Sequence, residues 1–261
     1  MADADALLEP GVSGRPVSPD PDPGQPPALT PDDSVMSLVD HLDELRSRLF
    51  KCIIAIAIGS TIGFLRATEI RNFLIAPLNR SVQVLGIGDA FVIQMKISIV
   101  AGIILAMPVL LYQLWAFVAP GLTPGERKTV RPWIPLALLF FAMGVAIAYF
   151  ILPYAIAFLF SFTDDVLVAQ PAAGPYFDFV TTLFLVFGLI MEFPILLIGL
   201  SRVGVVTSQR LTSSRRMIIL GIAVFSAIAT PGGDLVSPIV LGGTMYILFE
   251  LTVLFIKRSG R

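Results

Sequence analysis

Long apolar stretches alternate with short polar ones from about residue 49 to near the end of the chain. A stretch of roughly 20 apolar residues is long enough to cross the hydrocarbon core of a bilayer as a helix. Hydrophobic residues make up 56% of the 261 residues, more apolar surface than a soluble domain of this size can bury. The pattern therefore predicts an all-α polytopic membrane protein. We expect six transmembrane helices, at residues 49–65, 96–119, 133–160, 179–200, 217–230 and 238–256.

The predicted spans are not uniform. The fifth, 217–230, reaches only about 21 Å at a rise of about 1.5 Å per residue, whereas the hydrocarbon core is about 30 Å thick. We expect the bilayer to thin at its outer end, or water to enter there. Prolines interrupt three other spans and are expected to bend them into a curved arrangement. They are Pro108, Pro135, Pro153 and Pro194.

The basic residues predict the orientation in the membrane. Thirteen of the eighteen Lys and Arg residues lie in the N-terminal flank, the second and fourth loops and the C-terminus. Because cytoplasmic loops are enriched in Lys and Arg, both termini are predicted to be cytoplasmic.

Residues 1–35 differ in composition from the rest of the chain. They contain seven carboxylates, one arginine and eight prolines, so they cannot bury enough apolar surface to fold. We expect a disordered cytoplasmic tail, followed by a membrane domain at 36–261. This domain is expected to begin with an amphipathic helix, 37–50, whose apolar stripe lies at the membrane interface.

Composition argues against several kinds of function. One cysteine, Cys52, and one histidine, His41, make a metal centre or a catalytic triad implausible, so we expect no cofactor and no enzymatic activity. A nucleic-acid partner is not expected either, because no concentrated basic face is present.

An aromatic cluster ends the second span, and a sharp turn follows it. Tyr112, Trp115 and Phe117 carry rings typical of headgroup depth. Thr123 and Glu126 are then spaced as in a capping box, which accounts for the carboxylate locally. A carboxylate beside aromatic side chains is also suited to bind a guanidinium. The residues alone leave both roles of Glu126 open.

Two further carboxylates have local explanations and possible functions. Glu44 lies one helical turn before Arg48, so an i,i+4 ion pair explains it. Glu192 is the one ionisable residue in the middle of a predicted span, where a charge is costly. We keep three roles open for Glu192: a polar contact inside the concave face, a proton or ion site, and a helix-packing hydrogen bond.

Five segments together carry a family resemblance. They are 41–49, 108–122 with Glu126 and Arg127, 187–194, 230–234, and 245–250. In this order they resemble the signature segments of TatC, the large subunit of the twin-arginine protein translocase. The resemblance extends over 36–257 and implies a glove-like fold of six membrane helices.

The resemblance implies a receptor in the bacterial cytoplasmic (inner) membrane for folded precursor proteins whose signal peptides carry two consecutive arginines. By this resemblance, Glu126 and Glu44 bind the arginines, Phe117 packs beside the hydrophobic part of the signal motif, and Arg46 and Leu49 shape the same surface.

Three more positions resemble family residues tied to assembly or transport: Glu192, Asp234 and Pro77. The implied partners are the signal peptides, single-span TatA- and TatB-type subunits, further copies of the chain and the lipid bilayer, with transport driven by the proton-motive force. The rival interpretation is a proton-coupled small-solute transporter that uses Glu192. Such folds usually contain internal repeats, and the sequence contains no convincing one.

Overall fold

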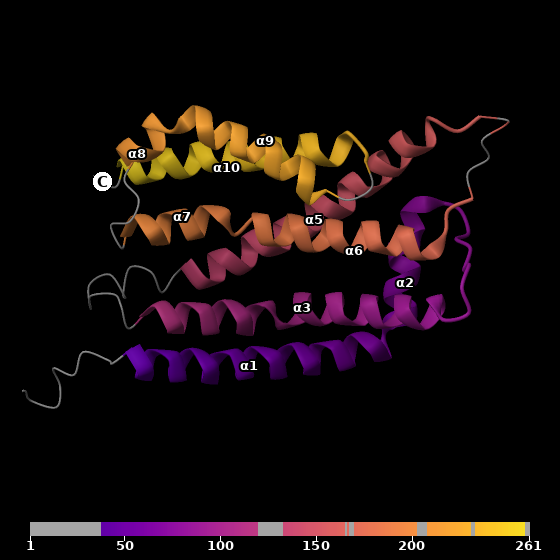
Figure 1. The fold of residues 1–261 in the computed structure, drawn as a ribbon, viewed down its shortest axis with the longest axis horizontal. Coiled ribbons are helices and arrows are strands. Elements are labelled where there is room, and N and C mark those ends of the chain that lie inside the picture. The colour runs from indigo at the N-terminus through magenta and orange to yellow at the C-terminus, as the bar shows by residue number, and fades with distance from the viewer. Residues whose placement is uncertain are drawn as a thin grey trace, which may run out of the picture. The chain divides into compact units, whose positions relative to one another are not determined.

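The computed structural model describes residues 38–119, 133–164, 166, 170–202, 208–230 and 233–258. The regular elements in these ranges are helices, as the sequence predicts (Figure 1). The chain divides into two units, 1–42 and 43–261, and the packing below concerns the second. The helices are α1 (Leu38–Leu65), α2 (Ala67–Ile75), the 3₁₀ helix η2 (Ala76–Leu78), α3 (Asp89–Val118), α5 (Trp133–Phe160), α6 (Ala173–Ile190), α7 (Phe193–Arg202), α8 (Ser208–Ser213), α9 (Arg215–Ala229) and α10 (Val236–Arg258).

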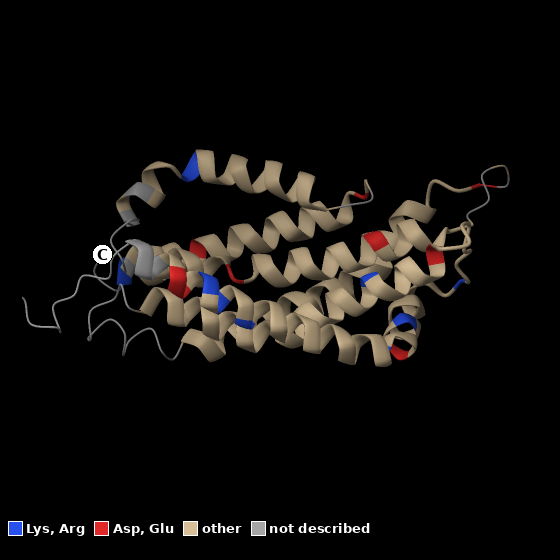
Figure 2. Cartoon of the chain, turned by 60° about the horizontal axis from the view of Figure 1, so that its bottom comes forward, with Lys and Arg blue, Asp and Glu red and all other residues tan. Residues whose placement is uncertain are grey.

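Within the described ranges, five helical segments are long and apolar enough to cross a membrane. Helix α9 has 15 residues, about 23 Å at 1.5 Å per residue, and is not one of them. Charged residues lie mostly toward the helix ends, with long uncharged stretches between them (Figure 2). Many large apolar side chains on the helices are exposed, as expected where lipid replaces water. The five segments are Leu42–Leu65, Asp89–Val118, Trp133–Phe160, Ala173–Ser201 and Val236–Arg258.

Helix α1 runs from Leu38 to Leu65 without a break. The predicted amphipathic helix 37–50 and the predicted span 49–65 are therefore parts of one helix, with no boundary at Leu49. The apolar repeat continues across this position, and the sequence there offers neither proline nor glycine to end a helix.

Most of the prolines in the predicted spans lie within continuous helices, so the bends expected at them are not accompanied by a break in the helix. Pro108 and Pro153 lie inside the unbroken helices α3 and α5, and Pro135 is the third residue of α5. Only near Pro194 does a helix end: α6 stops at Ile190, and α7 begins at Phe193. The reason is that proline lacks an N–H and its ring crowds the carbonyl four residues earlier, here that of Ile190.

Helices α5 and α6 form the most extensive helix pair, and α3 packs against both. Two glycines allow the close approach. A Cβ on Gly144 would lie 2.3 Å from the Phe187 carbonyl oxygen, and one on Gly188 would lie 2.7 Å from the Phe141 ring. The α6 side chains Phe177, Leu183 and Phe187 are almost fully buried in the resulting core. Helix α10 packs against α5, α7, α8 and α9.

Polar contacts join the segments at one end of the helices. Gln83 pairs with the segment before α6: its N–H donates to the Pro171 carbonyl at 2.9 Å, and its carbonyl accepts from Ala173 at 2.7 Å. The Tyr176 hydroxyl donates to the Leu74 carbonyl at 2.6 Å. Lys96 of α3 forms an ion pair with Asp178 of α6. These bonds fix α2 and the loops beside the starts of α3 and α6.

Candidate functional site

A carboxylate, a guanidinium and an amide meet between α1 and α3. Nε and one terminal nitrogen of Arg48 donate to the same Glu44 oxygen, Oε1, at 3.0 and 2.5 Å. The other terminal nitrogen of Arg48 donates to Oε1 of Gln113 on α3, at 3.3 Å. The ion pair expected from the i,i+4 spacing is therefore present, and Gln113 extends it to a second helix. We call Glu44, Arg48 and Gln113 the arginine cluster.

Glu44 keeps an unused acceptor in the arginine cluster. Its second oxygen, Oε2, is buried and has no hydrogen-bond partner among the described residues. The Glu44 and Arg48 side chains are each only 20% exposed. A buried acceptor without a donor is costly, so this oxygen is suited to receive an N–H group from a ligand.

The structure does not bring all the predicted peptide-binding residues together. Arg46 and Leu49 lie on exposed faces of α1, and the Arg46 guanidinium lies over the Phe50 ring, 5.8 Å from its centroid. Two residues along a helix are rotated by about 200°, so Arg46 faces away from Glu44. Phe117 is half-buried in the last turn of α3. Glu126 lies outside the described residues.

Two of the three rings predicted to cluster at the end of α3 contact each other. The rings of Tyr112 and Trp115 are 6.2 Å apart at an interplanar angle of 36°. They occupy the same two turns of α3 as Gln113, so the arginine cluster and the aromatic rings lie at one end of this helix.

We expect Arg48→Ala to lower the free energy of unfolding by about 1.5–3 kcal/mol, because it removes a charged donor from a mostly buried carboxylate. Thermal unfolding in nanodiscs measures this change. Arg66→Ala is the matched control, since Arg66 pairs with Glu69 while both side chains remain more than 60% exposed. An exposed pair contributes at most about 1 kcal/mol. Equal effects of the two substitutions would contradict the difference in burial.

Glu192 lies in the turn between α6 and α7, where Pro194 prevents a continuous helix. The residue is 7% exposed, and its Oε1 has no hydrogen-bond partner among the described residues. Its backbone carbonyl accepts from the N–H groups of Ile195 and Leu196, which lie in the first turn of α7. Glu192 thus combines a helix break with a buried, unsatisfied carboxyl oxygen.

Asp234 and Pro77 occupy other parts of the fold. Asp234 is 4% exposed, and its Oδ2 accepts the backbone N–H of Ser237 at 2.6 Å, which satisfies a free donor at the start of α10. Pro77 is half-buried in η2, which packs against α5. Glu192, Asp234 and Pro77 are therefore on different elements and do not form one cluster.

Sequence reasoning missed the long-range partners. Gln113 is 65 residues from Arg48, and nothing in the local pattern joins them. The Lys96–Asp178 ion pair left a weak signal, because both residues lie at the starts of predicted spans that face the same side. Opposite charges at equal predicted depth could have indicated this pair.

The helices and their exposed apolar faces define a polytopic helical membrane protein with a charged cluster between two of its helices. The family described as "Sec-independent protein translocase protein (TatC)" matches residues 40–243. The chain belongs to this family and is a subunit of the Sec-independent protein translocase.

Relatives in several bacteria support the assignment. The TatC protein of Carboxydothermus hydrogenoformans is 33% identical over 87% of this chain and 95% of its own length. The TatC protein of Azotobacter chroococcum is 36% identical over 85% and 90%. The TatCy protein of Bacillus subtilis is 33% identical over 87% and 91%.

A solved structure has the same fold. A crystal structure of the twin-arginine translocase receptor TatC in dodecyl maltoside aligns with a TM-score of 0.74 at 34% identity, covering 83% of this chain and 99% of that one. The relatives are named as protein-transport components, and none of these names supports the solute-transporter interpretation.

Proposed function

We propose that this chain is the receptor subunit that binds twin-arginine signal peptides and nucleates the export complex. The observation that supports this role is the arginine cluster. One oxygen of Glu44 already accepts two N–H groups from a guanidinium, and the other oxygen has no partner among the described residues. A planar guanidinium donates several N–H groups in a fixed geometry, whereas a lysine ammonium does not.

In this proposal Glu44 and Glu126 share the two signal-peptide arginines. Glu126 follows the C-terminal end of α3 in the chain, where Phe117 lies, and the arginine cluster contacts α3 at Gln113 one turn earlier. Phe117 would pack beside the hydrophobic part of the signal motif. Arg46 and Leu49, on exposed faces of α1, would contact a bound peptide from the side.

The proposal extends to topology and partners. We infer six spans, with α9 as the short fifth, both termini cytoplasmic, a disordered tail at 1–35, and a glove-like arrangement in the cytoplasmic (inner) membrane. Single-span TatA- and TatB-type subunits and further copies of this chain complete the complex. Glu192, Asp234 and Pro77 serve assembly or transport rather than peptide capture.

The test is peptide capture by the protein in nanodiscs, with a twin-arginine signal peptide and its twin-lysine version. We expect the arginine peptide to bind at least about tenfold more tightly, a difference of about 1.4 kcal/mol. Glu126→Gln and Glu44→Gln should each remove most of this preference, because a neutral amide is a weaker acceptor than a carboxylate.

Glu69→Gln is the matched control, since Glu69 also pairs with an arginine but is exposed in α2, which follows the other end of α1. It should leave capture unchanged. Equal binding of both peptides, or wild-type capture by Glu126→Gln, would contradict the proposal and leave Glu126 as a helix cap.

A further inference from the structure

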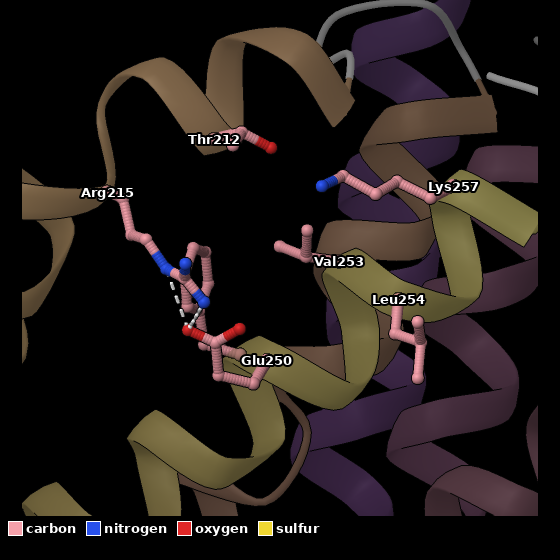
Figure 3. A pocket seen from close by; sticks show the side chains of 7 residues that line it. Thr212, Arg215, Glu250, Val253, Leu254 and Lys257 are labelled. Atoms are coloured by element: carbon pink, nitrogen blue, oxygen red, sulfur yellow. Dashed lines mark hydrogen bonds and ion pairs between the residues drawn. The ribbon is translucent and has the colours of Figure 1, made fainter.

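A pocket between α8, α9 and α10 is separate from the arginine cluster and from the three proposed transport residues. Figure 3 shows the side chains that line it, and its volume is about 100 Å³. Five of its lining residues belong to α10 and recur at helical spacing, so they form one face of that helix. The lining residues are Thr212, Arg215, Phe249, Glu250, Val253, Leu254 and Lys257.

The charged residues that line the pocket are two cations, Arg215 and Lys257, and one carboxylate, Glu250, so their net charge is positive. Nε and a terminal nitrogen of Arg215 donate to Oε1 of Glu250, and this hydrogen bond raises the pKa of Arg215. The Glu250 charge is therefore balanced by Arg215. Among the residues described, Lys257 has no carboxylate within ion-pair distance. Its ammonium points toward the Thr212 hydroxyl across the opening (Figure 3).

The pocket lies beside the end of a candidate membrane span. Lys257 and Arg258 form the last turn of α10, at the end of the candidate span Val236–Arg258. Basic residues in this position mark the boundary between hydrocarbon and headgroups. The volume is several times the roughly 10–15 Å³ that one water molecule needs on the same measure, so the pocket can admit a small polar group such as a phosphate.

An apolar stripe leads away from the pocket along α10. Ile247, Leu251 and Leu254 are each more than half exposed. Their spacing of four and then three residues places them on one face of the helix, and Leu254 also lines the pocket. An acyl chain lying on this stripe would place its phosphate beside Lys257. A free phosphate or an acidic peptide has no acyl chain to contact this stripe.

We propose that this pocket binds an anionic phospholipid, with its phosphate beside Lys257, Thr212 and Arg215 and an acyl chain along Ile247, Leu251 and Leu254. A headgroup with a net negative charge is favoured over a zwitterionic one, because the two cations and one carboxylate that line the pocket give it a net positive charge. The proposal does not depend on signal-peptide binding or on which side of the membrane is cytoplasmic.

The test measures lipid retained by the full-length protein after purification in detergent, using native mass spectrometry with added phosphatidylglycerol or phosphatidylcholine. We expect saturable binding of phosphatidylglycerol at about one lipid per chain, and little binding of phosphatidylcholine. Lys257→Gln should weaken phosphatidylglycerol binding about fivefold, the effect of one basic residue near an anionic headgroup. Lys257→Arg, which keeps the positive charge, should bind phosphatidylglycerol as the wild type does.

Arg258→Gln is the matched control, because Arg258 is the neighbouring cation on the same helix end but does not line the pocket. It should retain wild-type binding. Equal losses in Lys257→Gln and Arg258→Gln would overturn the proposal in favour of general attraction to charge. Complete release of the lipid by millimolar inorganic phosphate would also overturn it, since the acyl chain would then contribute nothing.

Discussion

Gly102→Val is expected to separate α1 from α3 and to lower the free energy of unfolding by about 3 kcal/mol, the upper end of the usual cost of overpacking. A Cβ at Gly102 would lie 2.4 Å from the backbone nitrogen and 2.7 Å from the Cα of Ser60. The backbone there cannot give way as a flexible side chain could. The same holds on α1. A Cβ added at Gly59 would lie 2.6 Å from the Gly102 carbonyl oxygen, and one added at Gly63 would lie 2.8 Å from the Ser98 carbonyl oxygen. Glycines four residues apart are typical of tightly packed membrane helices.

The same substitution should abolish signal-peptide capture. Gln113 lies about three helical turns from Gly102 along α3, and it contacts Arg48 of α1 at 3.3 Å. When the helices move apart, this contact is lost and Glu44 no longer lies beside α3. Thermal unfolding and peptide capture measured on one nanodisc preparation would test both effects.

Gly243→Ala is the control for a glycine that no neighbour constrains. A Cβ at Gly243 would meet nothing within 4 Å, although the residue lies in the interior of α10. Alanine favours the helix over glycine by about 1 kcal/mol, so the melting temperature should stay the same or rise slightly. If Gly102→Val behaves like Gly243→Ala, the α1–α3 contact does not hold the arginine cluster together.

Hydropathy predicts that these helices exist better than it predicts where they begin. The predicted segment 133–160 coincides with α5, Trp133–Phe160. Helix α3 instead begins at Asp89, seven residues before the predicted start at Lys96. Apolar character reports the hydrocarbon core, whereas a helix continues into the polar region for as long as its hydrogen bonds are satisfied.

Local patterns also could not separate the proline that ends a helix from those that do not. Pro108, Pro153 and Pro194 all stand in apolar surroundings, yet only Pro194 follows a break. Neighbouring helices decide whether the freed carbonyl of a proline-containing turn is satisfied, and a single sequence does not reveal those neighbours.

In the arginine cluster, too, one contact could be predicted from local spacing and the other could not. The Glu44–Arg48 pair follows from a spacing of four on one helix and could be predicted. The contact of Arg48 with Gln113 depends on the approach of α1 to α3. That approach is set by Gly59 and Gly102, whose role becomes visible only when the two helices are placed together.

Glu192→Leu is expected to lower export of a precursor without lowering the stability of the protein. The Glu192 Oε1 is buried and has no hydrogen-bond partner among the described residues, so leucine removes an unsatisfied polar atom at similar volume. The free energy of unfolding should stay unchanged or rise by about 1–3 kcal/mol. Export of a twin-arginine precursor should fall at least about tenfold, because an ionisable residue kept inside a membrane despite its cost is typically functional.

Asp234→Ala provides the contrast. One oxygen of Asp234 accepts the Ser237 N–H at the start of α10, so this substitution should lower the free energy of unfolding by about 0.5–2 kcal/mol, as for a lost helix cap. Thermal unfolding and an export assay on the same variants distinguish the two carboxylates. If Glu192→Leu unfolds more easily than wild type, Glu192 is a structural residue with a partner of its own. If the Glu192→Leu variant exports the precursor normally, the proposed transport role of Glu192 is wrong. Pro194 alone would then account for the helix break, and transport would not need the carboxylate.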